Sequence, residues 1–191
     1  MFLSPRRAIL ALTALLALCT AGCLTGSGDS AASVDPAVPV ASEPTANTAE
    51  DDAEYAPEFT LNDLSGAPVS LADSAGRVRL IDFWATWCPP CRDEIPMLNE
   101  LEQSYGSLGL TILAISDEST DVLQEFAASN KMAYTSLVGT ERVAMKYGVL
   151  GLPTAYLLDQ EGRVVESFFG PKPRKVLEGK IRELLDLAPA T

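Results

Sequence analysis

Two hydrophobic periodicities alternate between residues 55 and 191 and together predict one α/β domain. Short runs of β-branched and apolar residues predict strands, whereas apolar residues three and four positions apart predict amphipathic helices. The predicted strands cover residues 59–61, 69–71, 78–84, 110–115, 134–138, 154–158 and 164–168. The predicted helices cover residues 89–105, the part of 116–130 that follows a loop, 141–147 and 175–187. This order predicts a mixed central sheet with helices on both faces.

The first 23 residues have the pattern of an export signal. Arg6 and Arg7 precede an apolar run over residues 8–18, which is short for a transmembrane helix. The following Ala21-Gly22-Cys23 resembles a bacterial lipobox, in which the cysteine is lipidated and becomes the mature N-terminus. Because Thr20 stands where that pattern prefers Leu, three interpretations stay open: lipoprotein, cleaved secretory protein and retained signal anchor. We expect the lipoprotein, tethered to the membrane through Cys23.

Residues 24–54 have a different character from the rest of the chain. They are rich in Ala, Ser, Thr and Pro, with seven acidic residues and no basic or aromatic one. Such a segment buries too little apolar surface to offset the entropy of ordering it, so we expect a disordered acidic tether. The predicted organisation is therefore an export signal over 1–23, a tether over 24–54 and a folded domain over 55–191.

Composition narrows the possible chemistry. The chain of 191 residues has 14 basic and 26 acidic side chains, a net charge of −12 and no histidine. The acidic balance argues against a nucleic-acid partner, which requires a positive surface. Without histidine, no mechanism or zinc site that depends on imidazole is available, and we expect neither a metal nor a cofactor. Catalysis must then use carboxylates or thiols.

Cysteines stand in the sequence Trp87-Cys88-Pro89-Pro90-Cys91, where a predicted strand meets a predicted helix. A spacing of two residues lets the sulfurs form a small disulfide ring. The unpaired N–H groups and the dipole at a helix N-terminus lower a thiol pKa, which creates a nucleophilic thiolate without histidine. We therefore expect Cys88 to be the exposed, attacking sulfur and Cys91, one turn deeper, to resolve the mixed disulfide.

The Cys88–Cys91 pair has two other interpretations. Half of a zinc site would need two further ligands, but the chain has no histidine and its other cysteines lie in the leader. A purely structural disulfide is compatible with an exported protein, although a two-residue loop constrains the unfolded chain very little. Redox chemistry is the better prediction.

The run from Ile81 to Cys91 resembles the thioredoxin-fold thiol–disulfide oxidoreductases, and among them the membrane-tethered TlpA/ResA type. The similarity includes the opening Ala56-Pro57-Glu58-Phe59 and extends to about Leu187. It implies a thioredoxin-like fold with an N-terminal hairpin extension. It also implies electron exchange with the disulfides of substrate proteins, often in cytochrome c maturation.

The resemblance also assigns roles to single residues. Leu152-Pro153 matches the cis-proline loop that faces the cysteines and holds a substrate backbone, and Asp82 matches the buried acid that takes a proton from Cys91. Glu94 matches an active-site glutamate of the ResA-like branch, with a plain acid in the first turns of a helix as the alternative. The expected substrate-binding residues are Trp87, Pro89, Pro90, Leu152 and Pro153.

Four basic residues stand near the last predicted strand, one just before it and three after it. They are Arg163, Lys172, Arg174 and Lys175. We expect a solvated face and a helix cap here rather than a partner site.

The predicted protein is an extracytoplasmic, membrane-tethered oxidoreductase that reduces disulfides of exported proteins, for example apocytochrome c. A membrane thiol donor would regenerate it. A peroxidase of the peroxiredoxin type is an alternative, but its reactive cysteine follows a threonine three positions earlier, where this chain has Ala85. A second alternative is a tethered binding module that uses the cis-proline groove without turnover.

Overall fold

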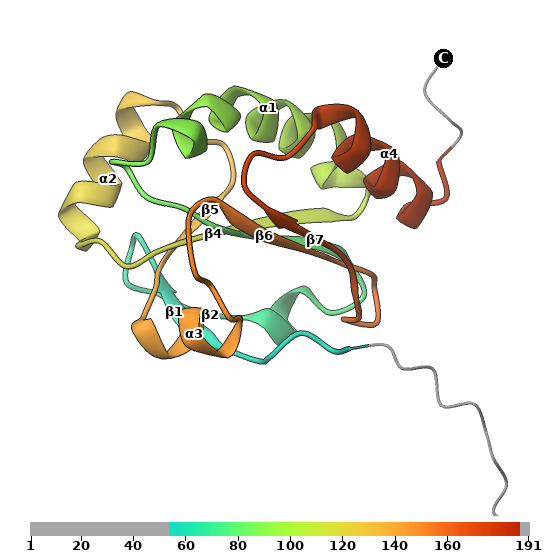
Figure 1. Ribbon diagram of the computed structural model, residues 1–191, viewed down its shortest axis with the longest axis horizontal. Coiled ribbons are helices and arrows are strands. Elements are labelled where there is room, and N and C mark those ends of the chain that lie inside the picture. The colour runs from blue at the N-terminus through green and yellow to red at the C-terminus, as the bar shows by residue number, and fades with distance from the viewer. Residues whose placement is uncertain (1–53, 188–191) are drawn as a thin grey trace, which may run out of the picture. The chain divides into compact units, whose positions relative to one another are not determined.

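The computed structural model of the protein describes residues 54–187, which form a mixed seven-stranded sheet with helices on both faces (Figure 1). The predicted export signal, Cys23 and almost all of the predicted tether lie outside the described residues. Between residues 54 and 187, no helix combines the length and the apolar character needed to cross a membrane.

The elements follow the predicted order. The strands are β1 (Thr60–Asp63), β2 (Pro68–Ser70), β3 (Val78–Phe83), β4 (Leu110–Ser116), β5 (Thr135–Val138), β6 (Thr154–Leu158) and β7 (Val164–Phe169). The α-helices are α1 (Pro89–Tyr105), α2 (Thr120–Ser129), α3 (Glu141–Lys146) and α4 (Arg174–Leu184), with short 3-10 helices η1 (Leu71–Ser74) and η2 (Gly106–Leu108). The predicted hairpin is present as the antiparallel pair β1–β2. The fold class predicted from the sequence is therefore confirmed.

Strand β3 lies inside the sheet, in the order β2-β1-β5-β4-β3-β6-β7. It is buried along its whole length, as a run of apolar residues predicts for a strand covered on both faces. Alternate side chains enter different cores: Leu80 packs into the cluster under α1 and α4, whereas Ile81 and Phe83 pack into the cluster that includes Val143 of α3. Figure 1 shows α1 and α4 on one face of the sheet and α3 on the other.

The register of β3, β6 and β7 brings three connecting segments together at one end of these strands. Strand β3 is antiparallel to β6, and its last residue, Phe83, pairs with Thr154, the first residue of β6. Thr154 pairs in turn with Phe169, the last residue of β7. The Gly170 N–H then donates to the Pro153 carbonyl oxygen at 2.8 Å. The segment after β3, the segment before β6 and the segment after β7 therefore start from neighbouring positions.

Two leucines provide a matched test of this core. Leu80 of β3 is fully buried, whereas Leu150 in the loop before β6 is fully exposed. We expect Leu80→Ala to lower the free energy of unfolding by about 2–5 kcal/mol, because it removes buried methyl groups and leaves a cavity. Leu150→Ala should change it by no more than about 0.5 kcal/mol. Chemical denaturation of both variants measures the difference, and equal effects would contradict the assigned packing.

Candidate active site

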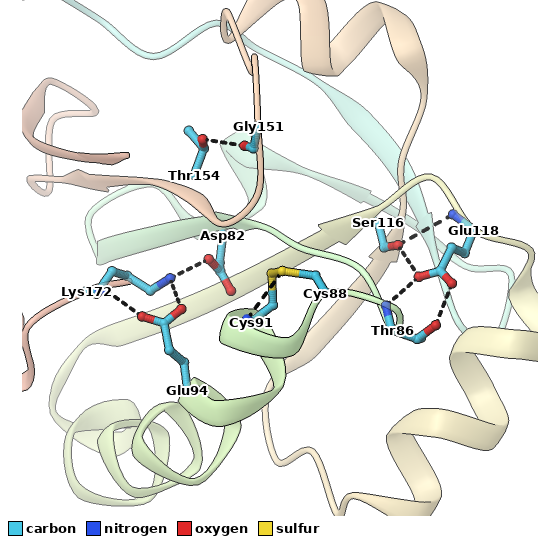
Figure 2. Close-up of a disulfide and its surroundings, with 10 residues drawn as sticks. All are labelled: Asp82, Thr86, Cys88, Cys91, Glu94, Ser116, Glu118, Gly151, Thr154 and Lys172. Atoms are coloured by element: carbon cyan, nitrogen blue, oxygen red, sulfur yellow. Dashed lines mark hydrogen bonds and ion pairs between the residues drawn. A yellow bond between two sulfur atoms is a disulfide. The ribbon is translucent and has the colours of Figure 1, made fainter. Parts of the chain in front are cut away.

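The Cys88–Cys91 pair forms a disulfide at the start of α1 (Figure 2). Cys88 is the N-cap of this 17-residue helix, and its sulfur accepts a hydrogen bond from the Cys91 N–H at 3.3 Å. Pro89 and Pro90 occupy the first helical positions, where a missing N–H removes no helical hydrogen bond. The Cys91 N–H and the helix dipole therefore act on the Cys88 sulfur, where they favour a thiolate over a thiol once the pair is reduced.

The exposure of the two cysteines differs from the prediction. Cys88 keeps only 3% of its surface accessible and Cys91 4%, so the expected exposed sulfur at Cys88 is wrong for the disulfide form. Both cysteines belong to the apolar cluster under α1, because the turn directs them inward. Trp87, next to Cys88, is instead 68% exposed.

The loop before β6 lies beside this turn. The Leu152–Pro153 peptide bond is cis, Pro153 is buried and Leu152 half-buried. Leu152 and Trp87 both line a hollow of about 250 Å³, and Leu152 and Pro153 line a second hollow of about 430 Å³ that extends to Phe169. Pro89 is exposed and Pro90 half-buried. The structure thus places Trp87 and Leu152 at one hollow and Leu152 and Pro153 at the second, whereas Pro89 and Pro90 line neither of them.

The two tryptophans have different surroundings. Trp84 is buried and its ring lies 5.4 Å from that of Phe126, so it is part of the core. The exposed ring of Trp87 has fully exposed Leu150 beside it along the first hollow. Of the two, only Trp87 offers an apolar surface at the rim of the site.

Asp82 and Glu94 both form an ion pair with Lys172, which was predicted to lie on a solvated face. The Lys172 side chain is completely buried, and its Nζ lies 2.8 Å from Asp82 Oδ1 and 2.7 Å from Glu94 Oε2. The prediction of a solvated surface lysine is therefore wrong. The reason is that the Lys172 side chain points inward, toward Asp82 and Glu94, as Figure 2 shows.

Burial controls the protonation of this cluster. Removal from water raises the pKa of both Asp82 and Glu94, and the Lys172 ammonium opposes the rise only in part. Burial alone would lower the pKa of Lys172, but the two carboxylates outweigh it and the pKa is raised. Lys172 therefore stays charged, while two carboxylates share one cation.

A second polar cluster holds the other side of the cysteine turn. The Glu118 carboxylate accepts hydrogen bonds from the Thr86 N–H at 2.7 Å and from the Thr86 hydroxyl at 2.6 Å. The Ser116 hydroxyl at the end of β4 donates to the same carboxylate at 3.1 Å. Figure 2 shows the disulfide between this cluster and the Lys172 cluster.

Glu118 is not among the site residues predicted from the sequence, and Lys172 was predicted on a solvated face, although the sequence carries a signal for both. Glu118 comes two residues after a buried strand that is parallel to β3, so the carboxyl ends of the two strands share an edge. Lys172 stands between Pro171 and Pro173, directly after β7. Among residues 54–187, no group of three or more histidine, cysteine, aspartate or glutamate side chains is arranged to hold a metal ion.

Comparisons with known proteins agree with this arrangement. Residues 53–167 match the model of the AhpC/TSA family. The thiol-disulfide oxidoreductase ResA of Bacillus anthracis is 34% identical over 131 residues, covering 68% of this chain and 76% of that protein. The crystal structure of a thiol:disulfide interchange protein DsbE from Chlorobium tepidum has a TM-score of 0.66 and 32% identity, over 71% of this chain and 98% of that one.

A third similar structure is that of a secreted thiol-disulfide isomerase from Corynebacterium glutamicum. Its TM-score is 0.64 and its identity 28%, covering 72% of this chain and 89% of that chain. Each of the three similarities covers more than two thirds of this chain.

Asp82→Asn tests the buried acid through the pH dependence of stability. The pKa of Asp82 is raised in the folded chain, so the folded chain binds this proton more tightly than the unfolded chain does. Asp82 therefore makes the wild type lose stability as the pH rises above 3.8, the ordinary pKa of an aspartate. Asparagine does not titrate and can still accept from Lys172. We expect the free energy of unfolding of the variant, relative to wild type, to increase from about pH 4 upward.

Chemical denaturation across this pH range measures that difference. Asp93→Asn, at an exposed position of the same helix, is the control for loss of one surface acid. A difference between Asp82→Asn and wild type that stays constant with pH would contradict the assigned burial of the charge.

Proposed function

Because this chain is a protein-disulfide oxidoreductase and belongs to the TlpA/ResA-like branch of the thioredoxin superfamily, within the AhpC/TSA family, we propose that it reduces disulfides of exported proteins through Cys88 and Cys91. The observation that carries the proposal is the Cys88–Cys91 disulfide at the N-terminus of α1, beside the Leu152–Pro153 loop.

Each cysteine has one task in this reaction. The Cys88 thiolate attacks a substrate disulfide and forms a mixed disulfide, while the first substrate sulfur leaves as a thiolate. Cys91 loses its proton and attacks the Cys88 sulfur, which releases the second substrate thiolate and restores the Cys88–Cys91 disulfide. The substrate gains two electrons and the enzyme loses two. Asp82, buried on β3 beside α1, is the proposed proton acceptor for Cys91.

An extended substrate segment is the proposed occupant of the surface around the cysteines. Trp87, Pro89 and Pro90 flank it on the side of α1, and Leu152 and Pro153 on the side of β6. Exposed apolar groups in this position favour a partly unfolded polypeptide, whose apolar side chains are accessible. This substrate class agrees with reduction of a protein before it folds around its cofactor, as in apocytochrome c.

The N-terminal pattern supports a location outside the cytoplasm. The export signal, Cys23 as lipid attachment site and the acidic tether over residues 24–54 would keep the domain at a membrane surface. The similar protein from Corynebacterium glutamicum is described as secreted. Reduction in such a compartment needs a supply of electrons, for which we propose a membrane thiol donor.

Single cysteine variants separate the two proposed roles. Cys91→Ser should trap a mixed disulfide with a substrate protein, because Cys88 attacks and nothing resolves the product. Cys88→Ser should abolish both trapping and insulin reduction. Gel electrophoresis without reductant detects the trapped species. Unchanged insulin reduction by Cys88→Ser would exclude the proposed site, and retained biological function without it would favour a binding module.

The reduction potential of the purified protein then decides the direction of electron flow. Tryptophan fluorescence in thiol buffers reports the state of the pair, since Trp87 and Trp84 lie next to it in the chain. A value around −270 mV, near that of thioredoxin, agrees with a reductant, whereas a value around −120 mV would make the protein an oxidant. Consumption of hydrogen peroxide that requires Cys88 but not Cys91 would favour the peroxidase.

Cys23→Ser tests the lipid attachment in bacterial cells. We expect the wild type to incorporate labelled palmitate and to sediment with membranes, and the variant to lose the label because it has no acceptor thiol. Cys19→Ser, inside the leader, is the matched control and should keep the label. Release of unlabelled wild type would indicate a cleaved secretory protein, and membrane retention without label a signal anchor.

A further inference from the structure

The buried Lys172 is held in place from both its main chain and its side chain. Pro171 and Pro173 have no N–H, so the Lys172 N–H is the one backbone donor in segment 171–173. It donates to Glu94 Oε1 at 2.5 Å, while Lys172 Nζ reaches the other oxygen of the same carboxylate at 2.7 Å. Glu94 therefore fixes the segment and the charge together.

The strand register explains why this lysine arrives beside the cysteines. Strand β7 ends at Phe169, two strands from the end of β3, and the Gly170 N–H ties the chain to the Pro153 carbonyl oxygen. Lys172 follows two residues later and meets Asp82, six residues before Cys88. Lys172 therefore enters the site from the β7 side of β3, whereas Glu118 enters it from the β4 side.

The charges in the cluster do not balance. Asp82 from β3 and Glu94 from α1 both face Lys172, and the third titratable neighbour, Tyr134 before β5, is buried. Burial and the two acids raise the pKa of Tyr134, so the phenol stays neutral. With both acids ionised the cluster carries one excess negative charge, and with one of them protonated it is neutral. An uncompensated buried charge is costly, so the cluster with both acids ionised readily accepts one proton and becomes neutral.

One oxygen of the cluster is placed for exchange with Cys91. Asp82 Oδ1 accepts from Lys172 at 2.8 Å, and its Oδ2 receives no hydrogen bond from any residue between 54 and 187. Figure 2 shows Asp82 between Lys172 and the disulfide, with this second oxygen on the side of Cys91.

We propose that Lys172 is a positioning residue for disulfide exchange: it keeps one carboxylate of the Asp82–Glu94 pair ionised beside Cys91, ready to take the Cys91 proton. The inference rests on the proposed roles of Cys88 and Cys91. In the resolving step, the Cys91 S–H bond breaks and its proton goes to the carboxylate. The sulfur then bonds to Cys88, and the electron pair of the mixed disulfide leaves on the substrate sulfur.

Removal of the Lys172 charge should shift the pH dependence of the resolving step in one direction. In Lys172→Met both carboxyls lose their cation, hold their protons more tightly and no longer accept one at neutral pH. The acidic limb of the pH–rate profile should shift to higher pH by at least about one pH unit. The resolving step should then be about tenfold slower at neutral pH. Glu94→Gln leaves Asp82 alone with Lys172, so the limb should move to lower pH.

Ellman's reagent is a suitable probe for the resolving step. The reduced full-length chain releases one aromatic thiolate when Cys88 forms the mixed disulfide, and a second when Cys91 resolves it. Stopped-flow absorbance across the pH range gives the rate of the second phase, and the double variant Cys88→Ser, Cys91→Ser supplies the background from Cys19 and Cys23, which is subtracted from every trace. Lys175→Met, at an exposed position of α4, is the control that should leave the profile unchanged.

Opposite shifts in Lys172→Met and Glu94→Gln support the inference, because a structural defect would lower the rate without moving the limb in two directions. Thermal unfolding checks that each variant is folded, and if Lys172→Met fails to fold, the Glu94→Gln shift decides alone. An unshifted profile in folded variants overturns the role of Lys172 and leaves the cysteine mechanism intact. A second phase that persists in Cys91→Ser overturns the cysteine mechanism itself.

Discussion

The antiparallel pairing of β3 with β6 is the constraint on which the site depends. It sets Phe83 opposite Thr154, so the chain that leaves β3 toward the cysteines starts beside the chain that has just passed Pro153. The pairing of β6 with β7 adds the segment that carries Lys172. A shift of one residue in either pairing would move alternate side chains to the wrong face of the sheet and separate these segments.

Two electrostatic devices act on the cysteines without any imidazole. The dipole of α1 has its positive end at Cys88, and the Cys91 N–H already points at the Cys88 sulfur in the disulfide form. On the inner side, a buried lysine is paired with two carboxylates, the group proposed to take the Cys91 proton. The first feature favours an anion at Cys88, and the proposed role of the second is to remove a proton from Cys91. Together they assign different properties to two chemically identical thiols.

The opposite side of the cysteine turn is held by hydrogen bonds of a different kind. Glu118 binds both the main chain and the hydroxyl of Thr86, and so orders the turn from the carboxyl end of β4. Trp87, the next residue along, projects into solvent. The turn is thus fixed at Thr86 and at the start of α1, while the Trp87 indole is available for contact with another chain.

The sequence by itself determined the elements and their order, and it predicted redox chemistry for the cysteine pair. These depend on local periodicity, on prolines at a helix start and on two cysteines only three positions apart. It also indicated Asp82, Glu94 and Pro153, through a resemblance in their motifs. Only the tertiary structure decided that Lys172 is buried and not solvated, that Glu118 holds the turn, and that Cys88 is covered in the disulfide form. Lys172 is 78 residues from Glu94, and Glu118 is 32 residues from Thr86. No local pattern encodes contacts over such separations, because strand register and helix packing create them.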